Sequence, residues 1–246
     1  MLLWPIIFVL LCGVAVIAVI VTDARPKTAG NEHVDGNNPA TQVLTAATVA
    51  TLSAPTKVPI LAPTPPPFVP AVLKDPQVVV CAVMRNEELY IDEWLRYIQY
   101  LGFDSVHIYD NADTPSEYYP SLKAIYGDFI TVKWNPGIQV QQAAYSHCAG
   151  KFKKNNTWAA FFDADEFIVL RKHKNIKEFL ADVAPTGGSV VLNWNIMSNN
   201  GIKKHRPGPV TSRFTYAARE LTKYVKSISY VDHVTWISVH NGGVIP

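Results

Sequence analysis

The chain has 246 residues and a formal net charge of +2. This near balance, with no basic arm or acidic tail, excludes the charge pattern of a nucleic-acid-binding protein, so no nucleic-acid partner is expected. The length suffices for one α/β domain with a sizeable core, together with extensions.

The amino terminus begins with an uncharged, almost wholly apolar run from Leu2 to Val21. About twenty residues of helix match a hydrocarbon core of roughly 30 Å, so residues 1–22 are predicted to be a single transmembrane anchor. A cleaved signal peptide is the alternative, but it usually has a basic start and a shorter apolar stretch. Residues 23–75 are rich in Ala, Thr and Pro and are predicted to form a disordered, partly polyproline stem.

Residues 76–246 are predicted to form the folded domain. Apolar strands are expected at 78–84, 105–109, 129–134 and from residue 158, and helices at 89–101, 115–126 and 139–154. A further helix is expected at 176–183, a strand at 189–196, and β-structure over 224–239. Alternation of strands and helices predicts the α/β fold class, with a mostly parallel sheet flanked by helices on both faces.

The central motif is an apolar strand that runs from Trp158 to Phe162 into Asp163-Ala164-Asp165-Glu166. If the chain stays extended here, residues i and i+2 point the same way, so Asp163 and Asp165 face one object. Two carboxylates suit a hard divalent cation, Mn²⁺ or Mg²⁺, that also holds phosphates. Ligands of open α/β sheets bind outside the carboxyl ends of the strands, where this motif falls. A solvated turn is the alternative.

Other polar residues follow the first two strands at the same predicted edge. Asn86 and Glu87 leave the first strand, as nucleotide contacts or as the N-terminal cap of a helix. Asp110 and Asn111 leave the second strand, as ribose contacts or as an Asx turn.

Three further features concern single residues. His147 is predicted to lie on a helix face rather than to bind metal. Cys81 and Cys148 are predicted to be buried free thiols in preference to a Cys81–Cys148 bridge, because three cysteines do not make a disulfide framework. Asn155-Asn156-Thr157 is an N-glycosylation sequon that is usable if its turn is exposed.

The motifs occur in an order that resembles glycosyltransferase family 92 and the related family-2-like glycosyltransferases, over about residues 78–240. The matching segments run from Cys81 to Glu88, Glu93 to Leu95, Leu101 to Gly102, His107 to Asn111, Gln142 to Cys148 and Phe162 to Phe167. The resemblance implies a GT-A fold, a nucleotide-sugar donor, and a divalent metal bound through Asp-x-Asp. It also implies a single-pass type II protein of the Golgi or ER lumen, similar to enzymes that move galactose from UDP-galactose onto glycans.

Carried over to this sequence, the resemblance implies that Asp163 and Asp165 bind the metal and the donor phosphates. It implies nucleotide contacts at Asn86, Glu87 and Asp110. Two late basic positions also match, Lys226 as a neutraliser of the diphosphate and His240 as a further metal ligand. Ala164 stands where Ile is commoner, and the chain stops shortly after His240, where family members usually continue.

The sequence therefore predicts a metal-dependent hexosyltransferase that uses a UDP-sugar and a glycan or glycoconjugate acceptor. An inverting enzyme needs a carboxylate base, for which Glu166, Glu220 and Asp232 are candidates. One alternative is a non-catalytic, membrane-anchored sugar- or nucleotide-binding relative. Another is an aspartate-nucleophile phosphatase, which is disfavoured because its acidic pair follows the first strand.

Overall fold

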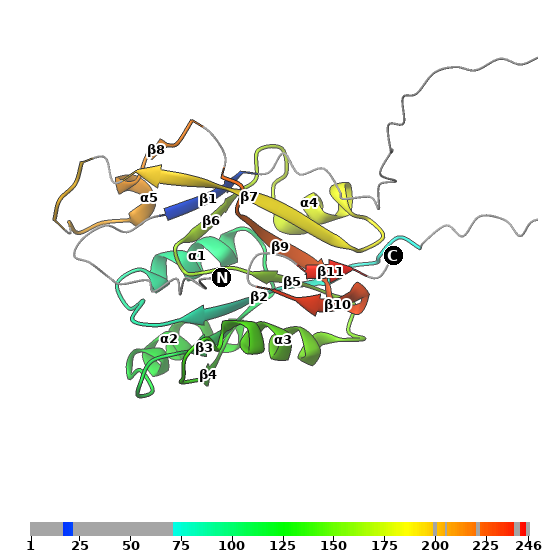
Figure 1. The fold of residues 1–246 in the computed structure, drawn as a ribbon, viewed down its shortest axis with the longest axis horizontal. Helices are drawn as coiled ribbons and strands as arrows, with labels where there is room; N and C mark the ends of the chain where they lie inside the picture. Colours follow the sequence, from blue (N-terminus) through cyan, green and yellow to red (C-terminus); the bar gives the residue numbers. More distant parts are fainter. Residues whose placement is uncertain are drawn as a thin grey trace, which may run out of the picture.

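A computed structural model describes residues 71–198, 201–204, 206–219 and 222–238, together with the backbone of short strands at 17–21 and 242–244. It has an α/β fold in which helices flank a mixed sheet (Figure 1). Within these described ranges, no helix has both the length and the apolar character that a membrane crossing requires.

Strands and helices alternate through the first half of the folded domain, as predicted. The elements there are β2 (Gln77–Met84), α1 (Ile91–Tyr100), β3 (Ser105–Asp110), α2 (Tyr118–Tyr126), the 3-10 turn η1 (Gly127–Phe129), β4 (Ile130–Trp134), α3 (Gln141–Phe152) and β5 (Thr157–Phe161). The second half contains β6 (Glu166–Val169), α4 (Ile176–Val183), β7 (Ser189–Ser198), α5 (Val210–Arg213), β8 (Tyr216–Ala217), β9 (Val225–Tyr230), η2 (Val231–His233), β10 (Val234–Ile237) and β11 (Gly242–Val244).

The large sheet has the strand order β4-β3-β2-β5-β9-β7-β1-β6, with β8 on β7. Strands β4, β3, β2 and β5 are parallel, as the alternation predicted. However, β9 lies antiparallel between β5 and β7, so the prediction of a mostly parallel sheet was wrong for the second half. Among the described residues between β7 and β9, the helix is the four-residue α5, beside the two-residue strand β8, and antiparallel neighbours need no helical crossover.

The sheet is covered on both faces, which explains why β2 is a continuous apolar run. Val78 and Val80 pack into a core shared with α1, α2 and α4, while Val79 and Cys81 pack on the opposite face with α3. A strand buried on both sides needs apolar residues at every position, not at alternate ones. The central strands are thereby fixed between two apolar layers, and their carboxyl ends meet along one edge.

The predicted amino-terminal anchor falls mostly outside the described residues, as does most of the predicted stem. The exception is β1 (Ile17–Val21), which pairs parallel with β6 and antiparallel with β7. The prediction of a membrane helix was therefore wrong for these five residues. An uncharged run rich in Ile and Val satisfies a membrane helix and a central strand equally well, so hydropathy could not separate the two.

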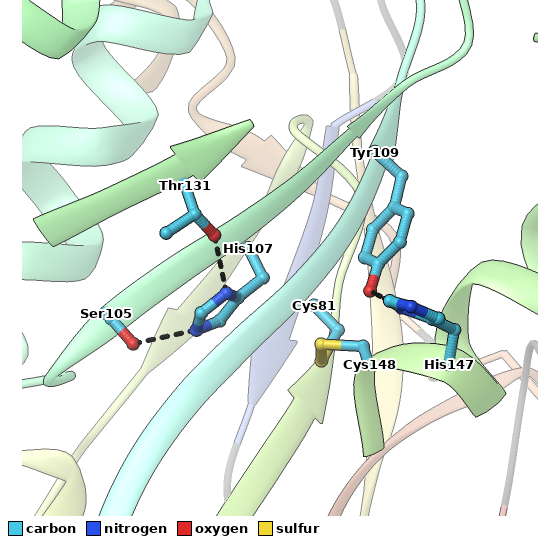
Figure 2. Close-up of a disulfide and its surroundings, with 7 residues drawn as sticks. All are labelled: Cys81, Ser105, His107, Tyr109, Thr131, His147 and Cys148. Atoms are coloured by element: carbon cyan, nitrogen blue, oxygen red, sulfur yellow. Dashed lines mark hydrogen bonds between the residues drawn. A yellow bond between two sulfur atoms is a disulfide. The ribbon is translucent and has the colours of Figure 1, made fainter. Parts of the chain in front are cut away.

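A disulfide joins Cys81 on β2 to Cys148 on α3, with their Cα atoms 6.2 Å apart (Figure 2). The prediction of two free thiols was wrong, because it rested on the number of cysteines and not on their positions. Packing of α3 across β2 brings together two residues that lie 67 positions apart in the chain. The bridge fixes α3 against the sheet, and with it the residues that α3 presents to the β5–β6 turn.

Candidate functional site

The Asp-x-Asp motif lies in the turn between β5 and β6, not on a strand. Strand β5 ends at Phe161, and β6 begins at Glu166. The Glu166 N–H donates a hydrogen bond to the Asp163 carbonyl at 3.1 Å, which closes the turn. The alternation of an extended chain therefore does not apply, so the expectation of an extended chain, from which Asp163 and Asp165 were predicted to face one object, was wrong. Their role as metal ligands stays a prediction.

Asp163 is held by side chains from two other elements. From β9, the Lys226 ammonium lies 2.7 Å from Oδ2. From α3, Gln141 donates to Oδ1 at 2.9 Å and the Tyr145 hydroxyl donates to it at 3.3 Å. Sequence reasoning missed Gln141, although its spacing of four residues from Tyr145 places both on one helix face.

Beneath Asp163, the Lys226 ammonium and the Glu166 carboxyl group form a buried polar support. Lys226 is fully buried, and its Nζ is also 3.4 Å from Glu166 Oε2, which accepts a hydrogen bond from the Asp163 N–H at 2.9 Å. Burial alone would lower the pKa of Lys226, but Tyr145, Glu166 and Asp163 outweigh it and raise that pKa, so the ammonium stays charged. Burial, followed by the charge of Asp163, raises the pKa of Glu166 well above its usual range. Glu166 is thus a supporting residue, beyond the reach of solvent.

Two carboxylates remain open at this edge, Asp165 and the half-buried Glu87. Asp165 is exposed to water, yet protein surrounds much of it; this desolvation and then the charge of Asp163 raise its pKa to about 7. Desolvation, followed by the charges of Asp165 and Asp163, likewise raises the pKa of Glu87 to about 7. Desolvation is the larger cause for both groups, and with pKa values near 7 both are partly protonated at neutral pH. The repulsion among the carboxylates of Glu87, Asp165 and Asp163 means that a cation bound between them would be stabilised.

This donor set fits a hard divalent cation that is held mainly through Asp165 with help from Glu87. Asp163 fits less directly, since both of its oxygens already accept hydrogen bonds. His240, the third predicted ligand, lies outside the described residues. Within the described ranges, no three His, Cys, Asp or Glu residues are already arranged around a common metal position.

The loops that follow β2 and β3 meet at the same edge. Asn86, at the end of β2, is exposed and has a φ of +58°, in the left-handed region that asparagine tolerates. Asp110 is buried and accepts hydrogen bonds from the backbone N–H groups of Ala112 at 3.1 Å and Ser116 at 3.0 Å. The Asx-turn alternative for Asp110 therefore describes its bonding in the structure, whereas a ribose contact stays a prediction.

The neighbouring Asn111 ties two loops together. Its Nδ2 donates to the carbonyl oxygens of Asn135 at 2.9 Å and Gly137 at 3.0 Å, in the loop after β4. Its N–H donates to the Met84 carbonyl at 2.8 Å, at the end of β2. Asn111 thus shapes the edge beside the acidic turn.

The structure separates one other candidate, Asp232, from this edge. Asp232 lies on η2, where it accepts a hydrogen bond from the Lys154 N–H. Because β9 runs antiparallel to β5, η2 lies at the amino end of β5, so the prediction of Asp232 as the base was wrong. His147 lies on α3 with its Nδ1 2.7 Å from the hydroxyl oxygen of Tyr109 on β3, which confirms its assignment to a helix face (Figure 2). Glu220 lies outside the described residues.

A sequence profile of Glycosyltransferase family 92 matches residues 77–242, which include every described residue of this site. The chain belongs to glycosyltransferase family 92. Its similarity extends to family 92 proteins of three plants. It is 30% identical to one from Arabidopsis thaliana over 54% of this chain and 23% of that protein. It is 32% identical to one from Ricinus communis over 40% of this chain and 17% of that protein.

The family 92 protein of Oryza sativa subsp. japonica is 26% identical over 55% of this chain and 24% of that protein. The family 92 chain therefore spans less than a quarter of each of these relatives. Family membership favours a glycosyltransferase over the phosphatase alternative. The geometry agrees, because Asp163 is paired with a buried lysine and is not free as a nucleophile.

Proposed function

We propose that this family 92 domain is a metal-dependent glycosyltransferase that moves a hexose from a UDP-sugar, such as UDP-galactose, to a glycan or glycoconjugate acceptor. The observation that carries the proposal is the excess of carboxylates at the carboxyl edge of the central strands. The carboxyl groups of Glu87, Asp163, Asp165 and Glu166 converge there, and the buried ammonium of Lys226 contacts Asp163 and Glu166. Such an edge is where open α/β sheets bind nucleotides, and a GT-A arrangement would use it in that way.

In this proposal Asp165 holds Mn²⁺ or Mg²⁺, and Glu87 contributes a second carboxylate. When bound, the cation neutralises charge on the donor diphosphate as the glycosidic bond breaks. Asp163 keeps the turn in place through Lys226, Gln141 and Tyr145. The role of Asp163 is therefore to position Asp165. Lys226 acts mainly by holding Asp163 in place, and not by contacting the donor phosphates as the sequence predicted.

Residues around the acidic turn are proposed to supply the nucleotide contacts and a further metal ligand. Asn86 and the loop organised by Asp110 and Asn111 lie on the nucleotide side of Asp165, at the ends of β2 and β3. His240 stays a proposed further ligand. We place the domain in the ER or Golgi lumen, a location that the Cys81–Cys148 disulfide supports because such bonds persist in oxidising compartments.

The test compares Asp165→Asn with Asp163→Asn and with Asp128→Asn, a fully exposed carboxylate near α2 that serves as the control. UDP release from UDP-galactose and other UDP-hexoses is measured with and without Mn²⁺. Asp165→Asn should lose on the order of 100-fold in Mn²⁺-stimulated activity while its unfolding temperature does not fall. Asp163→Asn should lose both activity and stability, and Asp128→Asn neither. Undiminished Mn²⁺-stimulated turnover in Asp165→Asn would refute the assignment.

A non-catalytic sugar- or nucleotide-binding relative is the second candidate. The observation that favours it is the engagement of both Asp163 oxygens by Lys226, Gln141 and Tyr145. Calorimetry with UDP-hexoses and Mn²⁺, alongside the turnover assay, separates the two functions. Binding that depends on Asp165, without hydrolysis or transfer by the wild-type chain, would establish this candidate instead.

A further inference from the structure

The turn between α3 and β5 carries the sole Asn-x-Ser/Thr sequon of the chain, Asn155-Asn156-Thr157. The Asn155 N–H donates to the Phe152 carbonyl at 3.1 Å, and Lys154 has a φ of +67°, as a type II turn requires at its third position. Asn155 is therefore the last residue of a tight turn on the surface. Its side chain is exposed, and it makes no hydrogen bond within the described residues.

The two residues that follow are used by the fold. The Asn156 amide donates to the Lys74 carbonyl at 2.8 Å and accepts from the Tyr230 hydroxyl at 3.1 Å. Thr157 is fully buried, and its hydroxyl donates to the Asn155 carbonyl at 3.1 Å. Of the three sequon side chains, that of Asn155 is exposed and makes no hydrogen bond within the described residues, whereas Asn156 is half-buried and Thr157 fully buried.

A second observation concerns the compartment in which the chain folds. The Cys81–Cys148 disulfide joins β2 to α3 within the core between them (Figure 2). Structural disulfides form in oxidising compartments such as the ER lumen, and sequons are glycosylated in the same lumen. A chain that acquires this bridge therefore meets the machinery that reads Asn-x-Thr.

We propose that Asn155 carries an N-linked glycan. In the transfer, Asn155 Nδ2 forms a bond to the anomeric carbon of an oligosaccharide carried on a polyprenyl diphosphate. The bond from that carbon to the diphosphate oxygen breaks, the lipid diphosphate leaves, and the amide loses one proton to a base. No oxidant or reductant is involved. Because Thr157 is buried once β5 pairs with β2, the transfer precedes the folding of this strand.

The position of the glycan keeps it away from the acidic turn. Asn155 precedes β5 and Asp163 follows it, so the two residues lie at opposite ends of this five-residue strand. At about 3.3 Å per residue, the strand separates them by roughly 16 Å along the sheet. The glycan would cover the amino edge of the sheet and leave the carboxyl edge open. The inference does not depend on the proposed transferase activity.

The experiment expresses the full chain in a eukaryotic secretory cell as wild type, Asn155→Gln and Asn156→Gln. Asn156→Gln is the matched control, because it removes the hydrogen bonds of the neighbouring amide but keeps the sequon. Each protein is treated with a peptide-N-glycosidase in heavy-oxygen water and analysed by gel mobility and peptide mass. Non-reducing peptide mapping reports on the Cys81–Cys148 bond in the same samples.

Wild type and Asn156→Gln should show one glycosidase-sensitive mobility shift and conversion of residue 155 to isotope-labelled aspartate. Asn155→Gln should lose the shift and keep the disulfide. The proposal is overturned if wild-type chains contain the disulfide but carry no glycan at residue 155. It is equally overturned if Cys81 and Cys148 stay reduced and Asn155 carries no glycan. Persistence of the glycosidase-sensitive shift in Asn155→Gln would also overturn it.

Discussion

Substitution of Lys226 by methionine tests whether a buried ammonium holds the acidic turn together. Lys226 is fully buried, and its Nζ lies 2.7 Å from Asp163 Oδ2 and 3.4 Å from Glu166 Oε2. At an effective dielectric constant of about 20, unit charges at the shorter distance attract by roughly 6 kcal/mol. Methionine avoids the cost of burying an ammonium, which offsets part of this loss. Removal of one partner from a buried ion pair should therefore cost about 3–5 kcal/mol of unfolding free energy at neutral pH.

The stability cost of Lys226→Met should increase with pH. Without Lys226 the remaining carboxyl groups are desolvated and lack a cation, so their pKa values rise above those of the unfolded chain. Protonation then stabilises the folded variant, and this stabilisation is lost as the pH increases through the raised pKa values. The difference between Lys226→Met and wild type should therefore be larger at pH 7.5 than at pH 5.5.

The assay is urea unfolding of the full chain at both pH values in the presence of EDTA. Arg96→Met is the control, because Arg96 forms an exposed helical ion pair with Asp92, and such solvent-screened pairs contribute little to stability. The double variant Lys226→Met/Asp163→Asn should recover part of the lost stability. The reasoning fails if Lys226→Met costs no more than Arg96→Met, or if its cost is the same at both pH values.

Three further predictions concern the disulfide, the open carboxylates and the Asx turn. Reduction of Cys81–Cys148, which closes a loop across 67 positions, should lower the unfolding free energy by about 4 kcal/mol, whereas a Cys81→Ala/Cys148→Ala variant should not respond to reductant. Burial and then repulsion raise the pKa of Asp165 to about 7, so the stability gained by its protonated form is lost as the pH rises through 7. Asp165→Asn should consequently raise the unfolding temperature in EDTA at pH 8, on the order of 2 °C, but not at pH 4; an equal shift at both pH values would contradict this. Asp110→Ala should cost about 1–3 kcal/mol in urea unfolding because it strands two backbone N–H groups; weaker donor binding at unchanged stability would instead support a ribose contact.

Local patterns in the sequence were sufficient to predict the first four strands of the folded domain and the helices between them. The period of apolar residues records how each segment is buried, and this depends on neighbours a few positions away. For the same reason the sequence placed Glu87, Asp110 and the acidic turn at one edge, since the carboxyl ends of parallel strands coincide. The order of motifs likewise identified glycosyltransferase family 92.

Only the tertiary structure decided which of these residues act together. Lys226 reaches Asp163 from 63 positions away because β9 lies beside β5, and the same antiparallel pairing carries Asp232 to the opposite edge. The Cys81–Cys148 bridge depends on how α3 crosses β2. Strand direction and helix placement result from long-range packing, and an apolar pattern is the same whichever way a strand runs. The sequence thus determined where carboxylates would gather, and the fold determined that Asp163 is bound internally while Asp165 is left to solvent.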